Sequence, residues 1–202
     1  GNIVNGYSFN ILGGYSMGTT RVELGGLFNI DRGDVGYGQI AGLFNVVGGR
    51  TSGVQMAGLI NLNRRKVTAV QFAGLLNANL DSVRGGQFAG LFNVNGRASE
   101  GAQFAGLFNV QPSYYKGTQF AGLFNVATHQ MKGTQVAGLI NYAHHIKGAQ
   151  IGLFNYADSV RGIPLGLISF VSHGYHKIEL SADEIFYANL AFRTGVRQFY
   201  NI

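Results

Sequence analysis

The 202-residue chain has no cysteine, which excludes disulfide bonds and thiolate metal sites. This absence fits an exported protein as well as a cytosolic one. No run of about 18 apolar residues occurs, which excludes a membrane-spanning helix. No charged-then-apolar leader stands at Gly1, and we expect that any signal peptide has already been removed.

Proline is also scarce, with 2 residues against 32 glycines, and only 12% of the residues are charged. Because 46% are hydrophobic, the chain is neither disordered nor collagen-like. The many glycines, with Phe, Val, Ile and Tyr between them, predict a β-rich fold with frequent turns and almost no helix. The formal net charge of +6 is modest and carries little information about partners.

Residues that carry chemistry are few and scattered. The acids of the repeat region are Asp31, Asp34, Asp81, Glu100 and Asp158, and the histidines are His129, His144, His145, His173 and His176. The only metal-like spacing is His173 to His176 with Glu179 nearby, and a structural zinc site needs a second ligand pair. Neighbouring His144 and His145 are expected on opposite sides of a strand. We therefore predict no enzyme, no metal and no cofactor.

A short repeat dominates the sequence, represented by Gln103-Phe104-Ala105-Gly106-Leu107-Phe108-Asn109-Val110. Its central glycine recurs every sixteen residues at Gly26, Gly42, Gly58, Gly74, Gly90, Gly106, Gly122 and Gly138, then after fourteen at Gly152 and Gly166. A strict short period is typical of stacked coils, so we predict an all-β solenoid of about ten coils of 14–16 residues. A strand spacing of about 4.8 Å would make a rod about 50 Å long.

Stacking places equal residues of successive coils in columns along the rod. Asn and Gln columns are expected to be structural, because each amide donates to the next and so satisfies a buried polar group. Strand alternation predicts one face with Gln103, Ala105, Leu107 and Asn109 and another with Phe104, Phe108 and Val110. The invariant leucine with alanine behind it suggests the tight interior, and the Phe column the outside.

Three segments are expected: 1–25 as capping coils, 26–170 as solenoid repeats, and 171–202 as a β-rich segment that begins a longer region. Terminal repeats are commonly atypical because they cap the array, and the period disappears from Val171 on.

Two surfaces are candidate binding sites. The first is an apolar interface of Phe72, Phe88, Phe104, Phe120, Phe92, Phe108 and Phe124. A second copy, the opposite wall of a flattened coil, the C-terminal segment or lipid are its candidate partners. The second is a basic ridge of Arg84, Lys116, Lys132, Lys147 and Arg161, each before a turn glycine. Such a ridge suits polyanions such as acidic glycans, or simply discourages edge pairing. Nucleic acid is not expected, since basic residues are too sparse.

The unit Gly-x-Gln-Phe-Ala-Gly-Leu-Phe-Asn-Val resembles the repeat of a family of bacterial cell-surface repeat proteins, over about Gly14 to Phe170. This resemblance implies a location at the cell surface or outer membrane, and no activity. One copy, Gln150 to Ala157, resembles the core repeat of curli-type functional amyloid subunits.

Together these features predict a non-enzymatic structural or adhesive module that presents turn residues to a protein or an anionic glycan on the bacterial cell surface. The alternatives are a membrane-associated β protein, whose Phe columns face lipid, and a self-associating fibre subunit.

Overall fold

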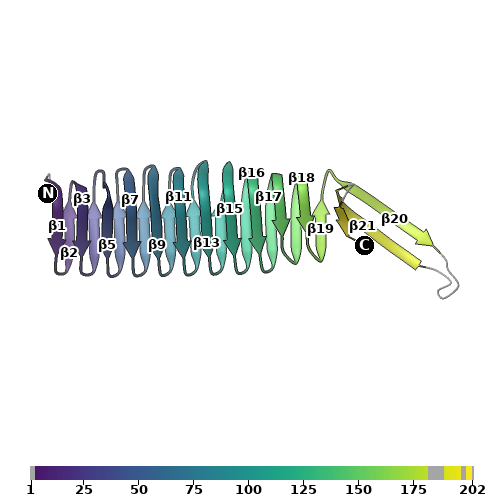
Figure 1. Cartoon of the computed structure of the whole chain (residues 1–202), viewed down its shortest axis with the longest axis horizontal. Helices are drawn as coiled ribbons and strands as arrows, with labels where there is room; N and C mark the ends of the chain where they lie inside the picture. The colour runs from purple at the N-terminus through teal and green to yellow at the C-terminus, as the bar shows by residue number, and fades with distance from the viewer. Residues whose placement is uncertain (1–2, 182–188, 197–198, 202) are drawn as a thin grey trace.

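The computed structural model describes residues 3–181, 189–196 and 199–201, with side chains described up to Gly174. It confirms the predicted β-solenoid: parallel strands stack coil upon coil along one axis (Figure 1). The described part of the chain contains no helix.

Each coil contributes one strand to each of two parallel stacks. The long-strand stack comprises β1 (Val4–Asn10), β3 (Gly18–Gly25), β5 (Gly38–Ala41), β7 (Thr51–Ala57), β9 (Val67–Ala73), β11 (Val83–Ala89), β13 (Ser99–Ala105) and β15 (Tyr115–Ala121). The short-strand stack comprises β2 (Gly13–Ser16), β4 (Phe28–Asp31), β6 (Phe44–Val47), β8 (Ile60–Asn63), β10 (Leu76–Asn79), β12 (Phe92–Asn95), β14 (Phe108–Gln111) and β19 (Ile168–Val171). Three strands run through both stacks: β16 (Phe124–Ala137), β17 (Ile140–Ile151) and β18 (Phe154–Leu165).

The register follows the sequence period. Phe104 pairs with Phe120 and Asn109 with Asn125, sixteen residues apart, while Asn141 pairs with Asn155, fourteen apart. Residues 1–25, expected as capping coils, contain β1 and β2, which pair in parallel with β3 and β4. The segment after Val171 forms a separate antiparallel sheet of β20 (Tyr175–Ser181), β21 (Asn189–Val196) and β22 (Phe199–Asn201).

The repeat unit is two strands joined by a turn, and this corrects the predicted interior. β13 ends at Ala105 and β14 begins at Phe108, so Gly106 and Leu107 lie in the turn between them. The turn interrupts strand alternation, and Leu107 is only half-buried at the outer edge of the rod. The placement of the leucine column in the interior was therefore wrong, whereas the outward placement of the Phe column is confirmed.

The interior near this turn is a continuous hydrogen-bonded array of amides. Asn93 Nδ2 donates to Asn109 Oδ1 at 3.0 Å and to the Phe104 carbonyl at 2.8 Å. Gln103 Nε2 donates to Gln87 Oε1 at 3.0 Å in a parallel column. The same bonds link the columns from coil to coil, so most of the fully buried amides keep their polar atoms paired, as the sequence predicted. Among the described side chains the exceptions are the amide oxygens of Asn29, Gln111 and Gln150, which have no hydrogen-bond partner.

The opposite half of the interior is mostly apolar, with Thr19, Thr51 and Ser99 as its buried polar residues. Its largest cluster consists of Tyr115, Ala127, Met131, Ala143, Ile146 and Ala157, all at most 1% exposed. The Tyr115 hydroxyl donates to the Gly101 carbonyl at 2.9 Å, which satisfies the one polar atom of that side chain. A cross-section through one coil is thus amide-lined near the Gly-Leu turn and hydrocarbon-lined near the other edge.

The turn glycine has a steric reason. A Cβ built on Gly106 would lie 2.0 Å from the carbonyl oxygen of Gly90 in the preceding coil, and Gly90 and Gly122 meet the same obstacle. Any side chain here would force successive turns apart, which explains why the repeat keeps glycine at this position.

We predict that Asn93→Ala destabilises the solenoid by about 2–5 kcal/mol, because it leaves the buried amide of Asn77 and the partly buried carbonyl of Phe104 with one hydrogen bond fewer. Leu91→Ala in the same coil is the control and should cost about 1 kcal/mol or less, since Leu91 is half-exposed. Urea denaturation followed by circular dichroism measures both, and equal losses would contradict the dominant role of the amide ladder.

Candidate functional site

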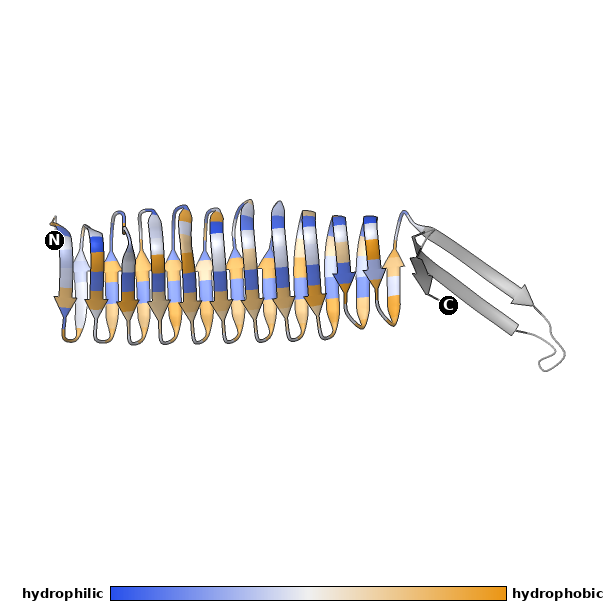
Figure 2. Ribbon diagram, viewed as in Figure 1, coloured by the Kyte–Doolittle hydropathy of each residue, from blue (hydrophilic) through white to orange (hydrophobic). Residues whose placement is uncertain are grey.

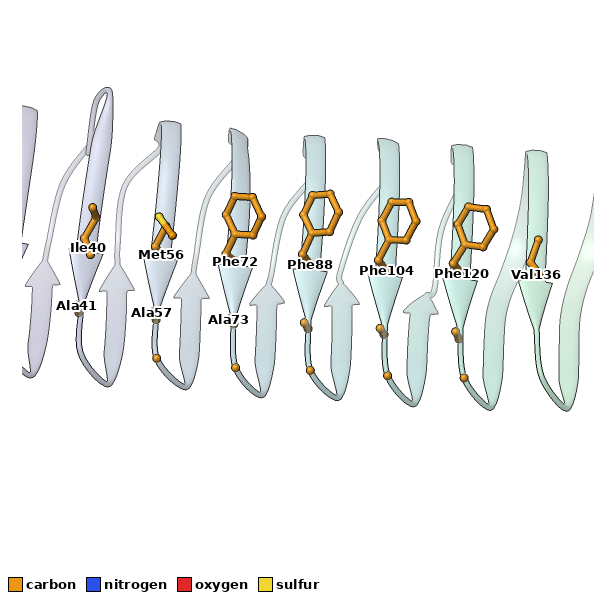
Figure 3. A pocket seen from close by; sticks show the side chains of 18 residues that line it. Ile40, Ala41, Met56, Ala57, Phe72, Ala73, Phe88, Phe104, Phe120 and Val136 are labelled. Carbon is orange, nitrogen blue, oxygen red and sulfur yellow. The ribbon is translucent and has the colours of Figure 1, made fainter.

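The outer surface of the long-strand stack carries a continuous aromatic column. The rings of Phe72, Phe88, Phe104 and Phe120 lie parallel, with centroids 4.9–5.0 Å apart, and each remains 36–38% exposed. Ile40 and Met56 precede them in the same column, and Val136 follows (Figure 3). Parallel offset rings at the strand spacing stabilise one another, but they leave an apolar strip in contact with solvent.

An open groove of about 760 Å³ runs beside this column. The Phe rings form its wall, and the alanines and glycines of the Gly-Leu turns line it from Ala41 to Gly122 (Figure 3). The groove crosses seven successive coils, from Ile40 to Val136, and it contains no charged side chain. Its shape is that of a long, shallow apolar trough and not of an enclosed catalytic pocket.

The short-strand stack carries two apolar columns side by side. Phe92, Phe108 and Phe124 stack with centroids 5.1–5.3 Å apart, as do Phe28 and Phe44 nearer the N-terminus. Two residues further along each strand lies the second column, which is Ile30, Val46, Leu62, Ala78, Val94, Val110, Val126, Tyr142, Tyr156 and Phe170. The seven predicted interface phenylalanines therefore lie on two opposite faces of the rod, in two separate columns.

The two apolar faces meet at the Gly-Leu turns, whose leucines project outward. Leu43, Leu59, Leu75 and Leu139 are 36–40% exposed, and the ends of the strands beside these turns are orange in Figure 2. We call the leucine column, together with the Phe columns on either side and the second column of the short-strand stack, the apolar edge. The sequence analysis did not predict this edge, because it assumed a single strand through the repeat and so placed the leucines in the interior.

The predicted basic ridge does form one column, but an acid interrupts it. Arg84 pairs in register with Glu100 and Glu100 with Lys116, and Glu100 makes ion pairs to both, at 3.7 Å and 2.8 Å. The hydrogen bond from Lys116 holds the pKa of Glu100 below its usual value.

Beyond Lys116, the cations Lys132, Lys147 and Arg161 follow one another in register. Among the described side chains none of the three has an acid within ion-pair distance. The uncompensated part of the ridge is thus its C-terminal half.

The histidines gather on the rod edge opposite the turn leucines. Ala143 and Ile146 both point inward, so His144 and His145 both point outward, with ring centroids 4.2 Å apart. Their predicted placement on opposite sides of a strand was wrong, because two residues separate the inward-facing Ala143 and Ile146, where strict strand alternation would have one. His144 contacts the carboxylate of Asp158, and His145 lies 2.8 Å from the Ser159 hydroxyl. The described residues contain no group of three metal-binding side chains, and His176 and Glu179 lie outside the described side chains.

A buried acid pair occupies the first complete coils. Glu23 stands in the Gln column in register with Gln39, and Asp31 stands in a column that later holds Asn63 and Asn79. Gln39 Nε2 donates to Glu23 Oε2 at 3.0 Å and to Asp31 Oδ2 at 2.6 Å. Burial, followed by the hydrogen bond with Asp31, raises the pKa of Glu23 to about 8. A protonated Glu23 reproduces the neutral glutamine of the other coils.

We predict that the N-terminal coils lose stability as the pH rises from about 4.5 to about 8. The folded state binds the Glu23 proton more tightly than the unfolded chain, whose pKa is near 4.5, so this contribution is complete below 4.5 and lost through pH 8. Glu23→Gln should remove this loss, which is on the order of a few kcal/mol. Hydrogen exchange of β3 amides at pH 5 and pH 9 tests it, and identical pH dependence in the variant and the wild type would contradict it.

No helix in the described part of the chain is long and apolar enough to cross a membrane. Searches with protein-family models, among curated proteins and among solved structures gave no match for this chain.

Proposed function

We propose that this chain is a non-enzymatic structural module of the bacterial cell surface, a rigid rod that contacts an extended partner through its outer side-chain columns. The observation that carries this proposal is the repetition itself. From Gly42 to Gly138 every coil presents an apolar side chain at the same outward position on each strand. The hydrogen-bonded amide ladder inside the rod holds these positions in register from coil to coil.

Repetition of this kind suits a long contact surface better than a catalytic centre. Catalysis requires unlike groups, such as a nucleophile, a base and an oxyanion donor, to converge on one point. Translation along a rod instead spreads identical groups at about 4.8 Å intervals. The location at the cell surface is supported by the resemblance of the repeat to bacterial surface repeat proteins.

Relative to the sequence prediction, the preferred contact moves from the turn residues to the apolar columns. The ridge from Arg84 to Arg161 is divided by Glu100, whereas the Phe and Leu columns continue without an acid or a base. A second candidate function, adhesion to an anionic glycan, is favoured by the three uncompensated cations Lys132, Lys147 and Arg161.

We predict that deletion of residues 90–121, two whole coils, leaves a folded rod shortened by about 10 Å. The new junction of Ala89 with Gly122 restores the repeat, and small-angle X-ray scattering measures the length. Deletion of residues 90–113 is the control, because one and a half coils destroy the register. If both deletions unfold, the uniform-rod proposal is wrong.

The location at the cell surface has its own test. Antibodies against the chain should label intact cells of the bacterium that produces it, and labelling only after permeabilisation would exclude the surface location.

For the glycan candidate, we predict that Lys132→Ala/Lys147→Ala/Arg161→Ala weakens binding to heparin, a model polyanion, by about tenfold or more at low salt. Arg84→Ala/Lys116→Ala is the control and should change binding less, because Glu100 already compensates one of these two charges. Equal effects of the two variants in an affinity measurement, or none, would remove the cation column as a glycan site.

A further inference from the structure

We propose that the apolar edge inserts into the surface of a lipid bilayer, so that the rod lies along the membrane with its charged edge in water. This inference rests on the proposed function, since it names the extended partner of the outer columns. Four features of the structure support it: the extent of the apolar surface, its shape, its backbone hydrogen bonding and the distribution of charge.

The apolar edge is far larger than the apolar patches of ordinary soluble proteins. Ten coils give a length of about 48 Å, and the path from Phe104 through the turn to Val110 is about 20 Å. Its area is therefore about 1,000 Å², compared with roughly 300–600 Å² for the largest patch of a typical monomer.

The shape of this surface favours a fluid partner. The Phe104 column lies on one face, the Leu107 column at the turn, and the Phe108 and Val110 columns on the opposite face. A second copy that packs flat on the short-strand stack would leave the Phe104 column and its groove uncovered. Hydrocarbon chains cover all three sides without shape complementarity.

The backbone amides of the turn are also suited to a medium that offers no hydrogen bonds. Gly106 N donates to Ala89 O at 3.3 Å, and the amides of Leu107 and Phe108 both donate to Leu91 O at 3.0 Å. The same three bonds recur at every turn from Gly42 to Gly138. Backbone amides that enter hydrocarbon must be paired within the protein, and these amides are.

Charge is confined to the rest of the coil. From Gly42 to Gly166, no charged residue lies within four positions of a marker glycine. Eleven cations and five acids occur between Leu27 and Phe170, and all but the buried Asp31 lie toward the other edge of the rod. A rod that is apolar along one edge and cationic along the other separates its apolar and charged residues as an amphipathic element at a membrane interface does.

The geometry also sets a depth. Phe104 is two residues from the turn glycine, which places its α-carbon about 6–7 Å from the edge at 3.3 Å per residue. Interfacial elements bury their apolar side about 5–10 Å into the boundary between headgroups and acyl chains. The Leu and Phe columns therefore reach the acyl region while the residues near Lys116 stay outside it.

The experiment uses the absence of tryptophan from the chain, which makes an introduced tryptophan a unique probe. Leu107→Trp reports from the apolar edge, and Thr128→Trp reports from the opposite, exposed edge. Each variant of the 202-residue chain is mixed with phosphatidylcholine–phosphatidylglycerol vesicles that carry brominated acyl chains. We expect a blue shift and quenching of at least about twofold for Leu107→Trp and no quenching for Thr128→Trp.

A vesicle flotation assay provides the matched loss-of-binding test. Leu91→Ser/Leu107→Ser/Leu123→Ser changes only half-exposed turn residues and should weaken partitioning by at least about tenfold with an unchanged circular dichroism spectrum. Arg84→Ser/Lys116→Ser/Lys132→Ser is the control and should lower only the extra binding that phosphatidylglycerol provides.

Three results would overturn the inference. They are failure of the wild-type chain to float, equal quenching of the two tryptophans, or a Leu107→Trp emission that is already blue-shifted in a dimer without lipid, which would assign the edge to a second copy. The coil deletions test the proposed function separately. If the shortened rod folds and vesicle binding fails, only the lipid assignment is lost; if the deletions unfold, the quenching result still stands.

Discussion

The hydrogen-bonded amide ladder is the interaction on which the rest of the structure depends. A coil of sixteen residues has few inward positions, and this chain fills those next to the turn with Asn and Gln, which are fully buried. Such side chains are costly inside a protein unless each amide has a partner. The ladder supplies that partner from the next coil, so the amides are satisfied only when successive coils keep one register. The stability of the solenoid therefore depends on the strict repetition of Asn and Gln from coil to coil.

An amide interior has a consequence for the outside. Because Gln103 and Asn109 occupy the space between the strands, the rings of Phe104 and Phe108 point outward. Near the other edge the arrangement reverses, with Met131 and Ile146 inside and Lys132 and Lys147 outside. Along the edge with the Gly-Leu turns the solenoid has polar side chains inside and apolar side chains outside. Along the other edge it has apolar side chains inside and charged side chains outside, so the rod has two chemically distinct sides.

The sequence predicted the architecture well because a strict period specifies stacking, and stacking specifies the columns. It failed at the turn: alternation assumed one strand through Gly106 and Leu107, whereas the strand ends at Ala105 and the next begins at Phe108. The same failure hid the exposed Leu column. The sixteen-residue period already places Glu100 between Arg84 and Lys116, so the division of the basic ridge could have been predicted from the sequence. The raised pKa of Glu23 could not, because it depends on how deeply that carboxyl is buried and on its contact with Asp31.

The exposed aromatic columns are a structural consequence of the coil and not isolated surface residues. One exposed phenylalanine costs a soluble protein little, but a column repeats the same exposure in every coil, so the unfavourable contact with water grows in proportion to the length of the rod. Stacking between neighbouring rings, at 4.9–5.3 Å, covers only the sides that face along the axis. The remaining surface is open along the whole edge, and only a partner that is itself extended can cover it. The length of the rod, the amide-lined interior beside the Gly-Leu turns and the continuous apolar edge therefore all favour a contact made along the whole rod and not at a single coil.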